Sequence, residues 1–186
     1  MKKIQLIFQL SIIVIFQIQA QLVITGPNEL CENAMGTYSV SGGTMPYNWD
    51  VPPGVTVSPS MGTNVTITAG TNNFIITVTD ANSSTTEDVT VNAKPNAGTI
   101  TGSNEVCVSS TVTLMNSSGN GTWSSNDPSK ATIDNAGRVT GISAGNVTIK
   151  YLVINSSGCR DSALHSMTVN AKPNAGTITG SNEVCV

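Results

Sequence analysis

Residues 146–154, NVTIKYLVI, decide the fold class. Val147, Ile149 and Tyr151 lie two residues apart, with a threonine and a lysine between them. A period of two places the apolar side chains on one face of a β-strand and the polar ones on the other. The turn-forming sequences S-A-G and N-S-S-G flank the stretch. We therefore predict a strand with one buried face.

Short stretches of the same kind fill the chain on both sides of this strand. They are TNVTITA (63–69), NFIITVTD (73–80), EDVTVN (87–92), TVTLMN (111–116), GTWSS (121–125), KATID (130–134), RVTG (138–141) and ALHSMTV (163–169). No helical period is found after the first twenty residues. Many short strands joined by Asn, Gly and Ser turns predict an all-β chain of tandem immunoglobulin-like β-sandwich modules.

A repeat sets the number of modules. The sequence TVNAKPNAGTITGSNEVCV occupies residues 90–108 and again residues 168–186, which are 78 residues apart, and ITGPNELC at 24–31 is a looser copy. A fixed period indicates an array of modules. We expect a signal peptide at 1–20, sandwiches at 21–94 and 95–172, and the start of a third, incomplete module at 173–186. The turn-rich N-A-K-P-N-A-G at 92–98 is the expected joint.

The N-terminus has the pattern of a signal peptide. Lys2 and Lys3 precede an apolar run at residues 4–19, and Ala20 is the small residue before the expected cleavage between Ala20 and Gln21. An uncleaved membrane anchor is the alternative. Three glutamines interrupt the run, which is also short of the ~20 residues of a comfortable span. We predict a secreted or cell-surface product with no membrane span in the mature chain.

The composition excludes several classes of protein. Charged residues are 10% of the chain, the isoelectric point is about 4.9, and 64 of the 186 residues are Thr, Ser or Asn. Coiled coils and basic nucleic-acid binders do not fit these values. Loss of the signal peptide would leave a net charge of −5, so no nucleic-acid partner is expected.

Residues 121–151, GTWSSNDPSKATIDNAGRVTGISAGNVTIKY, resemble the bacterial immunoglobulin-like group 2 module. That family has a Trp-Ser-Ser strand, an Ala-Thr-Ile strand, Gly-x-Val-Thr-Gly and Ala-Gly-x-x-x-Ile. The positions on this pattern are Trp123, Ala131, Ile133, Val139, Gly141, Ala144, Gly145 and Ile149. The resemblance extends over residues 98–170.

The first module carries a different resemblance. SGGTMPYNWDVPPGVTV (41–57) and FIITVTDANSSTTEDVTVN (74–92) are similar to immunoglobulin-like and polycystic-kidney-disease-type modules of bacterial surface proteins. This resemblance covers residues 21–92. Both families imply extracellular spacers and adhesion modules, not catalysts.

The four cysteines are unevenly distributed. Cys31, Cys107 and Cys185 occupy the same position in the three copies of the repeat, and Cys159 alone lies elsewhere, in a turn before the last strand of the second module. Two cysteines in one secreted module are normally bonded. Because the first strand of such a sandwich often lies beside the last, we predict a Cys107–Cys159 disulfide. Two free buried thiols are the alternative.

No catalytic, cofactor-binding or metal-binding residue is expected. His165 is the single histidine, in phase with Met167 and Val169, and no Ser/Cys–His–acid arrangement can be assembled around it. Carboxylates lie singly in turns without a D-x-D-x-D loop, so calcium between modules is the weaker alternative. Trp49 and Trp123 match the core tryptophan of sandwiches, with a sugar-binding face as the alternative.

The function predicted from these features is that of a multi-module surface protein of bacterial type. Its immunoglobulin-like repeats would act as stalk or adhesion modules, with neighbouring modules and an unknown surface protein or glycan as partners. The alternative is a set of accessory modules of a secreted glycosidase or peptidase whose catalytic domain lies beyond residue 186. An inert spacer is the third possibility.

Overall fold

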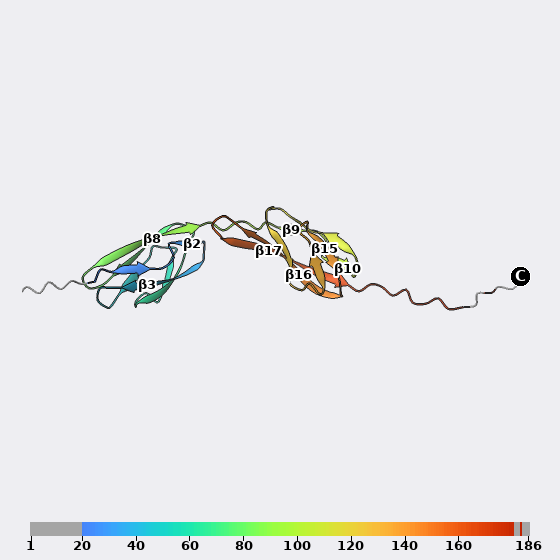
Figure 1. Cartoon of the computed structure of the whole chain (residues 1–186), viewed down its shortest axis with the longest axis horizontal. Helices are drawn as coiled ribbons and strands as arrows, with labels where there is room; N and C mark the ends of the chain where they lie inside the picture. Colours follow the sequence, from blue (N-terminus) through green and yellow to red (C-terminus); the bar gives the residue numbers. More distant parts are fainter. Residues whose placement is uncertain (1–19, 181–182, 184–186) are drawn as a thin grey trace, which may run out of the picture. The chain divides into compact units, whose positions relative to one another are not determined.

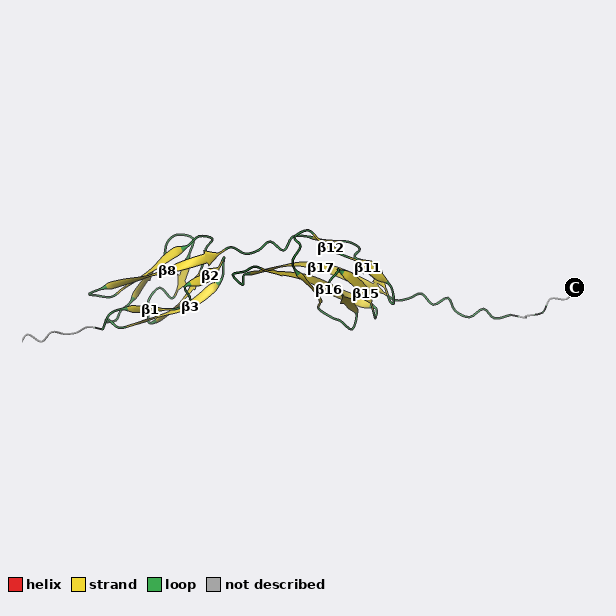
Figure 2. Ribbon diagram, turned by 45° about the horizontal axis from the view of Figure 1, so that its top comes forward, coloured by secondary structure: helices red, strands yellow, loops and turns green. Residues whose placement is uncertain are grey.

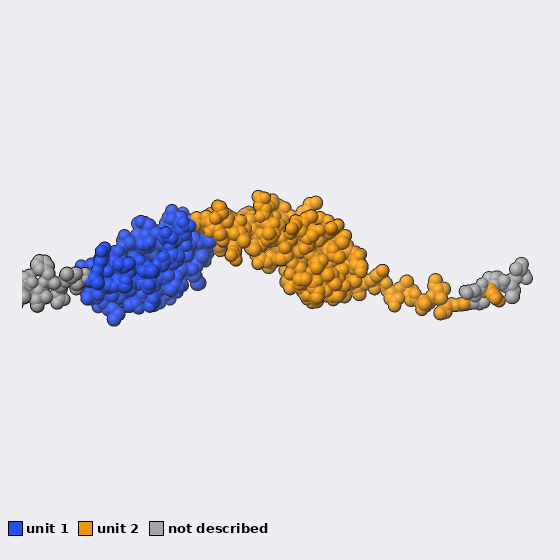
Figure 3. Space-filling model, in the orientation of Figure 1, with its two compact units in different colours: residues 1–91 blue, residues 92–186 orange. Residues whose placement is uncertain are grey.

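The structure, a computed structural model, describes residues 20–180 and Glu183. The expected signal-peptide run at 4–19 lies outside the described residues. The described residues form seventeen strands and no helix (Figure 2), which confirms the all-β prediction. They divide into two compact units, Met1–Val91 and Asn92–Val186 (Figure 3).

Unit 1 contains two four-stranded sheets (Figure 1). In spatial order the first sheet contains β1 (Val23–Thr25), β3 (Met35–Ser41), β6 (Asn64–Thr68) and β5 (Thr56–Ser58), and the second contains β2 (Glu29–Cys31), β8 (Ser84–Asn92), β7 (Phe74–Thr79) and β4 (Asn48–Asp50). The β7–β8 hairpin is antiparallel, from Phe74 opposite Val89 to Thr79 opposite Ser84.

The core of unit 1 follows from strand alternation. In β7, Phe74, Ile76 and Val78 are buried, while Ile75 between them is half exposed. Trp49 is only 2% exposed, and its Nε1–H donates to the Gly62 carbonyl at 2.8 Å. The expectation that Trp49 is a core residue is therefore confirmed.

Unit 2 has a larger sheet and two small ones. The larger sheet contains, in spatial order, β10 (Glu105–Cys107), β17 (Arg160–Asn170), β16 (Gly145–Ile154) and β13 (Thr122–Ser125); the small sheets are β11 (Thr111–Thr113) with β15 (Arg138–Gly141) and β14 (Ala131–Ile133), and β12 (Met115–Asn116) with β9 (Ile100–Thr101). The β16–β17 hairpin is the longest pairing, from Gly145 opposite Val169 to Ile154 opposite Arg160. In contrast, β10 runs parallel to β17.

Residues 146–154 form the strand that was predicted from their sequence. Val147, Ile149 and Tyr151 in β16 are all buried in the core of unit 2. Residues 111–116, expected as one strand, are instead two, because the chain changes partner at Leu114. β11 pairs with β15 and β12 with β9, while the Leu114 N–H donates to the Gly137 carbonyl at 2.8 Å.

The structure also bears on the membrane question. Among the described residues, no helix has the length and apolar character needed to cross a membrane.

Candidate functional site

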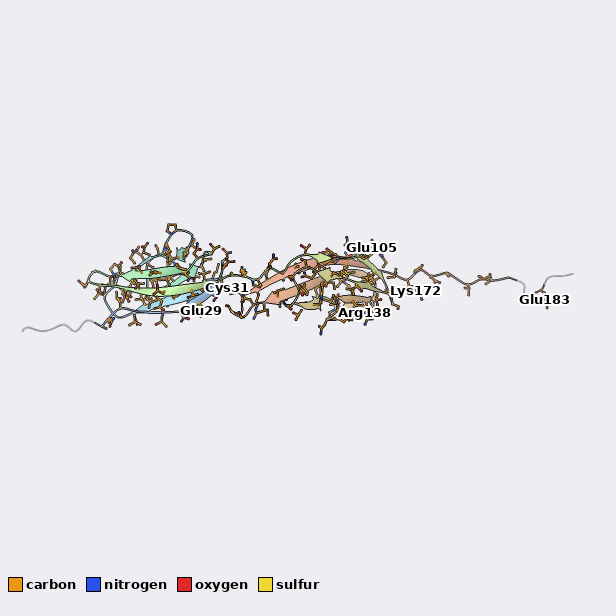
Figure 4. All side chains as sticks on the ribbon, turned by 90° about the horizontal axis from the view of Figure 1, so that it is seen from above. Glu29, Cys31, Glu105, Arg138, Lys172 and Glu183 are labelled. Carbon is orange, nitrogen blue, oxygen red and sulfur yellow. The ribbon has the colours of Figure 1, made fainter. Side chains whose placement is uncertain are left out.

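The cysteines have contrasting environments. Cys107 ends β10, opposite Asn170 of β17, and carries an exposed free thiol. Cys159 precedes β17 directly, is 1% exposed and is disulfide-bonded. Cys31 lies at the end of β2 (Figure 4) and is also disulfide-bonded. Cys185 lies outside the described residues.

The predicted Cys107–Cys159 disulfide is therefore wrong. β10, the strand that ends at Cys107, does lie beside β17, the last strand of the module, but the two strands are parallel. Cys107 lies opposite Asn170, the last residue of β17, whereas Cys159 precedes Arg160, the first residue. An eleven-residue strand at ~3.3 Å per residue places these ends more than ~30 Å apart, and a disulfide joins Cα atoms within about 7 Å.

The loop that carries Cys159 holds the beginning of unit 2 in place. The Asn155 side chain donates to the Ala93 carbonyl at 2.8 Å, and the Asp161 carboxylate accepts the Ala97 N–H at 2.8 Å. The Cys159 Sγ lies 3.6 Å from the Asn92 carbonyl. Ala97 is only 2% exposed, so the expected joint at residues 92–98 is part of the folded module.

Two hollows on unit 2 are candidate ligand surfaces. The larger, of about 490 Å³, lies over β10, β16 and β17 and is lined by Asn104, Glu105, Asn126, Asn146, Val147, Thr148, Ser166, Met167 and Thr168. Several of its polar groups hydrogen-bond to one another: the Thr148 N–H donates to the Asn126 side chain at 2.8 Å, and the Thr168 hydroxyl donates to the Asn146 side chain at 3.2 Å. His165 lies at 3.2 Å from the Ser103 carbonyl, in the strand position expected for it.

The second hollow has an aromatic wall. It measures about 340 Å³ and includes Met115, Asn135, Trp123 and Tyr151 in its lining. The Trp123 and Tyr151 rings pack with centroids 4.6 Å apart. Trp123 is partly buried against the core, whereas Met115 is 69% exposed. Trp123 thus packs against the core, as expected, and also lines this hollow, while the alternative of a sugar-binding face stays a prediction.

The carboxylates organise turns. Asp80 accepts the backbone N–H groups of Thr44, Asn82 and Ser83, and these hydrogen bonds lower its pKa to about 2. Hydrogen bonds also lower the pKa of Asp127, chiefly from Ser129. In the part of the chain that the structure describes, no group of three or more His, Cys, Asp or Glu side chains is placed to hold a metal ion.

The predicted cleavage site lies at the start of the described chain. The Ala20 carbonyl accepts the Gly43 N–H at 2.8 Å. Gly42 has a φ of 80°, and a Cβ there would lie 2.1 Å from the Gln21 carbonyl oxygen, so this turn requires glycine. Cleavage after Ala20 stays a prediction.

Both modules match known domain families. Residues 87–160 match the bacterial Ig-like domain (group 2), and residues 17–94 match the PKD-like domain. The two resemblances seen in the sequence are therefore confirmed, each over its own part of the chain. A search of curated proteins gives no significant match.

Solved structures share the fold. The bacterial integrin-binding protein invasin is similar over 80% of this chain and 38% of its own length, with 13% identity and a TM-score of 0.52. The C-terminal fragment of intimin, solved with the intimin-binding domain of its translocated receptor, is matched over 82% of this chain and 64% of the fragment, with 18% identity and a TM-score of 0.46. The chain thus spans less than two thirds of either protein, and the likeness to invasin supports an immunoglobulin-like fold.

Proposed function

We propose that this chain is part of a secreted or cell-surface protein of bacterial type, in which immunoglobulin-like repeats form a stalk that carries adhesion modules. The observation that carries the proposal is the repeat. Residues 90–108 recur at 168–186, and the first copy both ends the PKD-like module and begins the Ig-like one. One sequence therefore serves as the connection between successive modules, as an array requires.

The disulfide chemistry supports the extracellular part of the proposal. Cys31 and Cys159 are disulfide-bonded, and such bonds persist in oxidising compartments such as the periplasm and the cell exterior. The signal-peptide pattern at residues 1–20 supports the same location.

Expression of residues 1–186 with a C-terminal epitope tag in a bacterial host tests the location. We expect export, with Gln21 as the new N-terminus by mass spectrometry. A matched variant, Ala20→Arg, removes the small residue at the cleavage point and should retain the signal peptide. Cytoplasmic protein that begins at Met1 would contradict the proposal.

The hollow beside Trp123 supports an adhesion role within the array. An aromatic edge next to an exposed methionine and an exposed amide, Asn135, is suited to a neutral ligand such as a glycan. Binding of the purified chain to a glycan array, weakened at least tenfold by Asn135→Ala and unchanged by Asn72→Ala in unit 1, would support adhesion. Glycan binding that Asn135→Ala leaves unchanged would assign the ligand to another surface.

A further inference from the structure

Charge is distributed unevenly along the chain. Residues 20–91 contain no lysine, arginine or histidine and have six carboxylates, which are Glu29, Glu32, Asp50, Asp80, Glu87 and Asp88. Residues 92–180 contain six lysine and arginine residues and four carboxylates, a formal charge of +2 with His165 neutral. Surfaces of opposite charge attract each other and orient an encounter between two molecules. We therefore looked for complementary faces on the two kinds of module.

The outer face of the β16–β17 hairpin in unit 2 pairs two cations with two exposed aliphatic side chains. Lys150 lies directly opposite Leu164, and Arg160 lies directly opposite Ile154. All four residues are exposed, Leu164 at 65% and Ile154 at 50%. Neither Lys150 nor Arg160 forms an ion pair with a described residue. We call these four residues the cationic face.

The outer face of β4, β7 and β8 in unit 1 has the complementary arrangement. Ile75, which is 51% exposed, lines two hollows of about 330 and 370 Å³. Asp88 lines the first hollow and Asp50 the second, and both carboxylates are exposed. Asp88 lies directly opposite Ile75, and Asp50 lies directly opposite Thr77. These residues form the acidic face, in which each hollow has one carboxylate in its lining.

The spacing of the charges is similar on the two faces. Asp50 and Asp88 are two strands apart and offset by two residues, which places their Cα atoms about 12 Å apart. Lys150 and Arg160 are on neighbouring strands and offset by four residues, which gives about 14 Å. The flexible side chains of lysine and arginine can cover a difference of about 2 Å. Both cations can therefore reach a carboxylate at the same time.

We propose that the acidic face of one molecule binds the cationic face of a second copy of the chain. The two cations pair with the two carboxylates, and the aliphatic side chains opposite the cations enter the hollows beside Ile75. The contact joins different molecules, so it depends on the surface of each module and not on how the modules of one chain are arranged. Because the chain carries both faces, a second copy is sufficient as the partner.

The inference goes beyond the proposed function, because it names the partner as another copy of the same chain. The contact is heterologous, since the two molecules contribute different surfaces to it. It combines apolar side chains with charged groups around them, as protein interfaces do.

Sedimentation velocity of the purified chain, with its free thiols alkylated to prevent disulfide-linked dimers, tests for self-association. The mean sedimentation coefficient should rise with concentration between about 1 μM and about 1 mM, a range that covers weak protein contacts. The association should weaken at least about tenfold between 0.1 and 1 M salt, because the Debye length falls from about 10 Å to about 3 Å. A sedimentation coefficient that is independent of concentration would overturn the proposal, as would association that salt does not weaken.

Charge reversal on either face tests which surfaces meet. Lys150→Glu with Arg160→Glu should abolish self-association, because both faces are then acidic. Asp50→Lys with Asp88→Lys should abolish it as well, because both faces are then cationic. Self-association that persists at full strength in either doubly substituted chain would contradict the assignment of the faces.

A matched control separates the effect of the face from that of net charge. Arg138→Glu with Lys172→Glu changes the net charge by the same amount as reversal of the cationic face, but Arg138 belongs to β15 and Lys172 follows β17. This control should weaken association by no more than about threefold. Complete loss of association in the control would assign the attraction to net charge and overturn the pairing of the two faces.

Mixing the two charge-reversed chains distinguishes contact between molecules from contact within one. Each reversed chain alone should be monomeric, but the faces of one are complementary to the faces of the other. The mixture should therefore form a one-to-one complex, with circular dichroism showing the same β-sheet content in both variants. A mixture of folded variants that sediments only as monomers would overturn the proposal. Because this outcome does not depend on export or on a glycan, it is distinguishable from failure of the proposed function.

Discussion

Residues 92–101 and 170–179 carry the same ten amino acids, N-A-K-P-N-A-G-T-I-T, in two different surroundings. Both copies form the same local turn: the Asn96 side chain accepts the Gly98 N–H at 2.8 Å, and the Asn174 side chain accepts the Gly176 N–H at 2.9 Å. Both glycines have positive φ, 65° and 70°. The turn therefore depends on the local sequence alone.

The two copies differ in secondary structure and in the burial of their side chains. In the first copy Ile100 belongs to β9 and is 8% exposed, whereas the matching Ile178 is fully exposed. Ala97 is held by the Asp161 carboxylate and the Asn116 amide, both of which belong to the module that follows in sequence. The comparison shows that one sequence becomes a strand only where later residues of its module pair with it.

The largest expected effect is a difference in proteolysis between two identical bonds. A protease that cleaves before large apolar residues should cut Thr177–Ile178 at least about 100-fold faster than Thr99–Ile100, since the second bond must first open from a folded module. Peptide mapping over time measures both rates in one sample. Equal rates would show that the folded unit 2 does not protect the first copy of the repeat, residues 92–101, from cleavage.

A substitution that destabilises unit 2 should reduce the protection of the Thr99–Ile100 bond. Ile149 is fully buried, and Ile149→Ala should lower the free energy of unfolding by about 2–5 kcal/mol. Cleavage at Thr99–Ile100 should then accelerate by more than tenfold while Thr177–Ile178 stays unchanged. Ile76→Ala, at an equally buried position of unit 1, is the control and should leave both rates unaltered.

A smaller effect is expected from the single contact at Ala97. Asp161→Ala leaves the buried Ala97 N–H without its acceptor, at a cost of about 1–2 kcal/mol. Cleavage at Thr99–Ile100 should therefore accelerate roughly five- to thirtyfold. Asp88→Ala, at an exposed position of β8, controls for loss of a surface carboxylate. If both variants behaved alike, the contact would have no role in ordering the first copy.

The smallest effect concerns the start of unit 1, where Asp80 holds Thr44 next to the Gly42–Gly43 turn. Hydrogen bonds lower the folded-state pKa of Asp80 to about 2, below the ordinary value of 3.8. The stabilisation is therefore present above pH 4 and lost as the pH falls toward 2. Hydrogen exchange of the Thr44 amide should accelerate across this window, and Asp80→Asn should remove that component. An acceleration of the same size in Asp80→Asn would contradict the assignment.

Local strand structure could be predicted from the sequence, whereas the pairing of distant strands could not. Alternation in residues 146–154 predicted β16 and its buried face, because that strand packs on the core along its whole length. It did not predict the break at Leu114, since the change of partner depends on β9 and β15, which are distant in sequence. For the cysteines, it was predictable that the strand ending at Cys107 lies beside the last strand, but the parallel direction of the two strands was not.

The most direct test of the central claim, that a module orders the repeat that begins it, uses the extended chain with residues 109–172 appended after Val186. Cleavage at Thr177–Ile178 should slow by at least about 100-fold, to the rate of Thr99–Ile100, because the added residues supply the copies of Asn116 and Asp161. Rapid cleavage at Thr177–Ile178 in an extended chain whose third module is folded would contradict the claim.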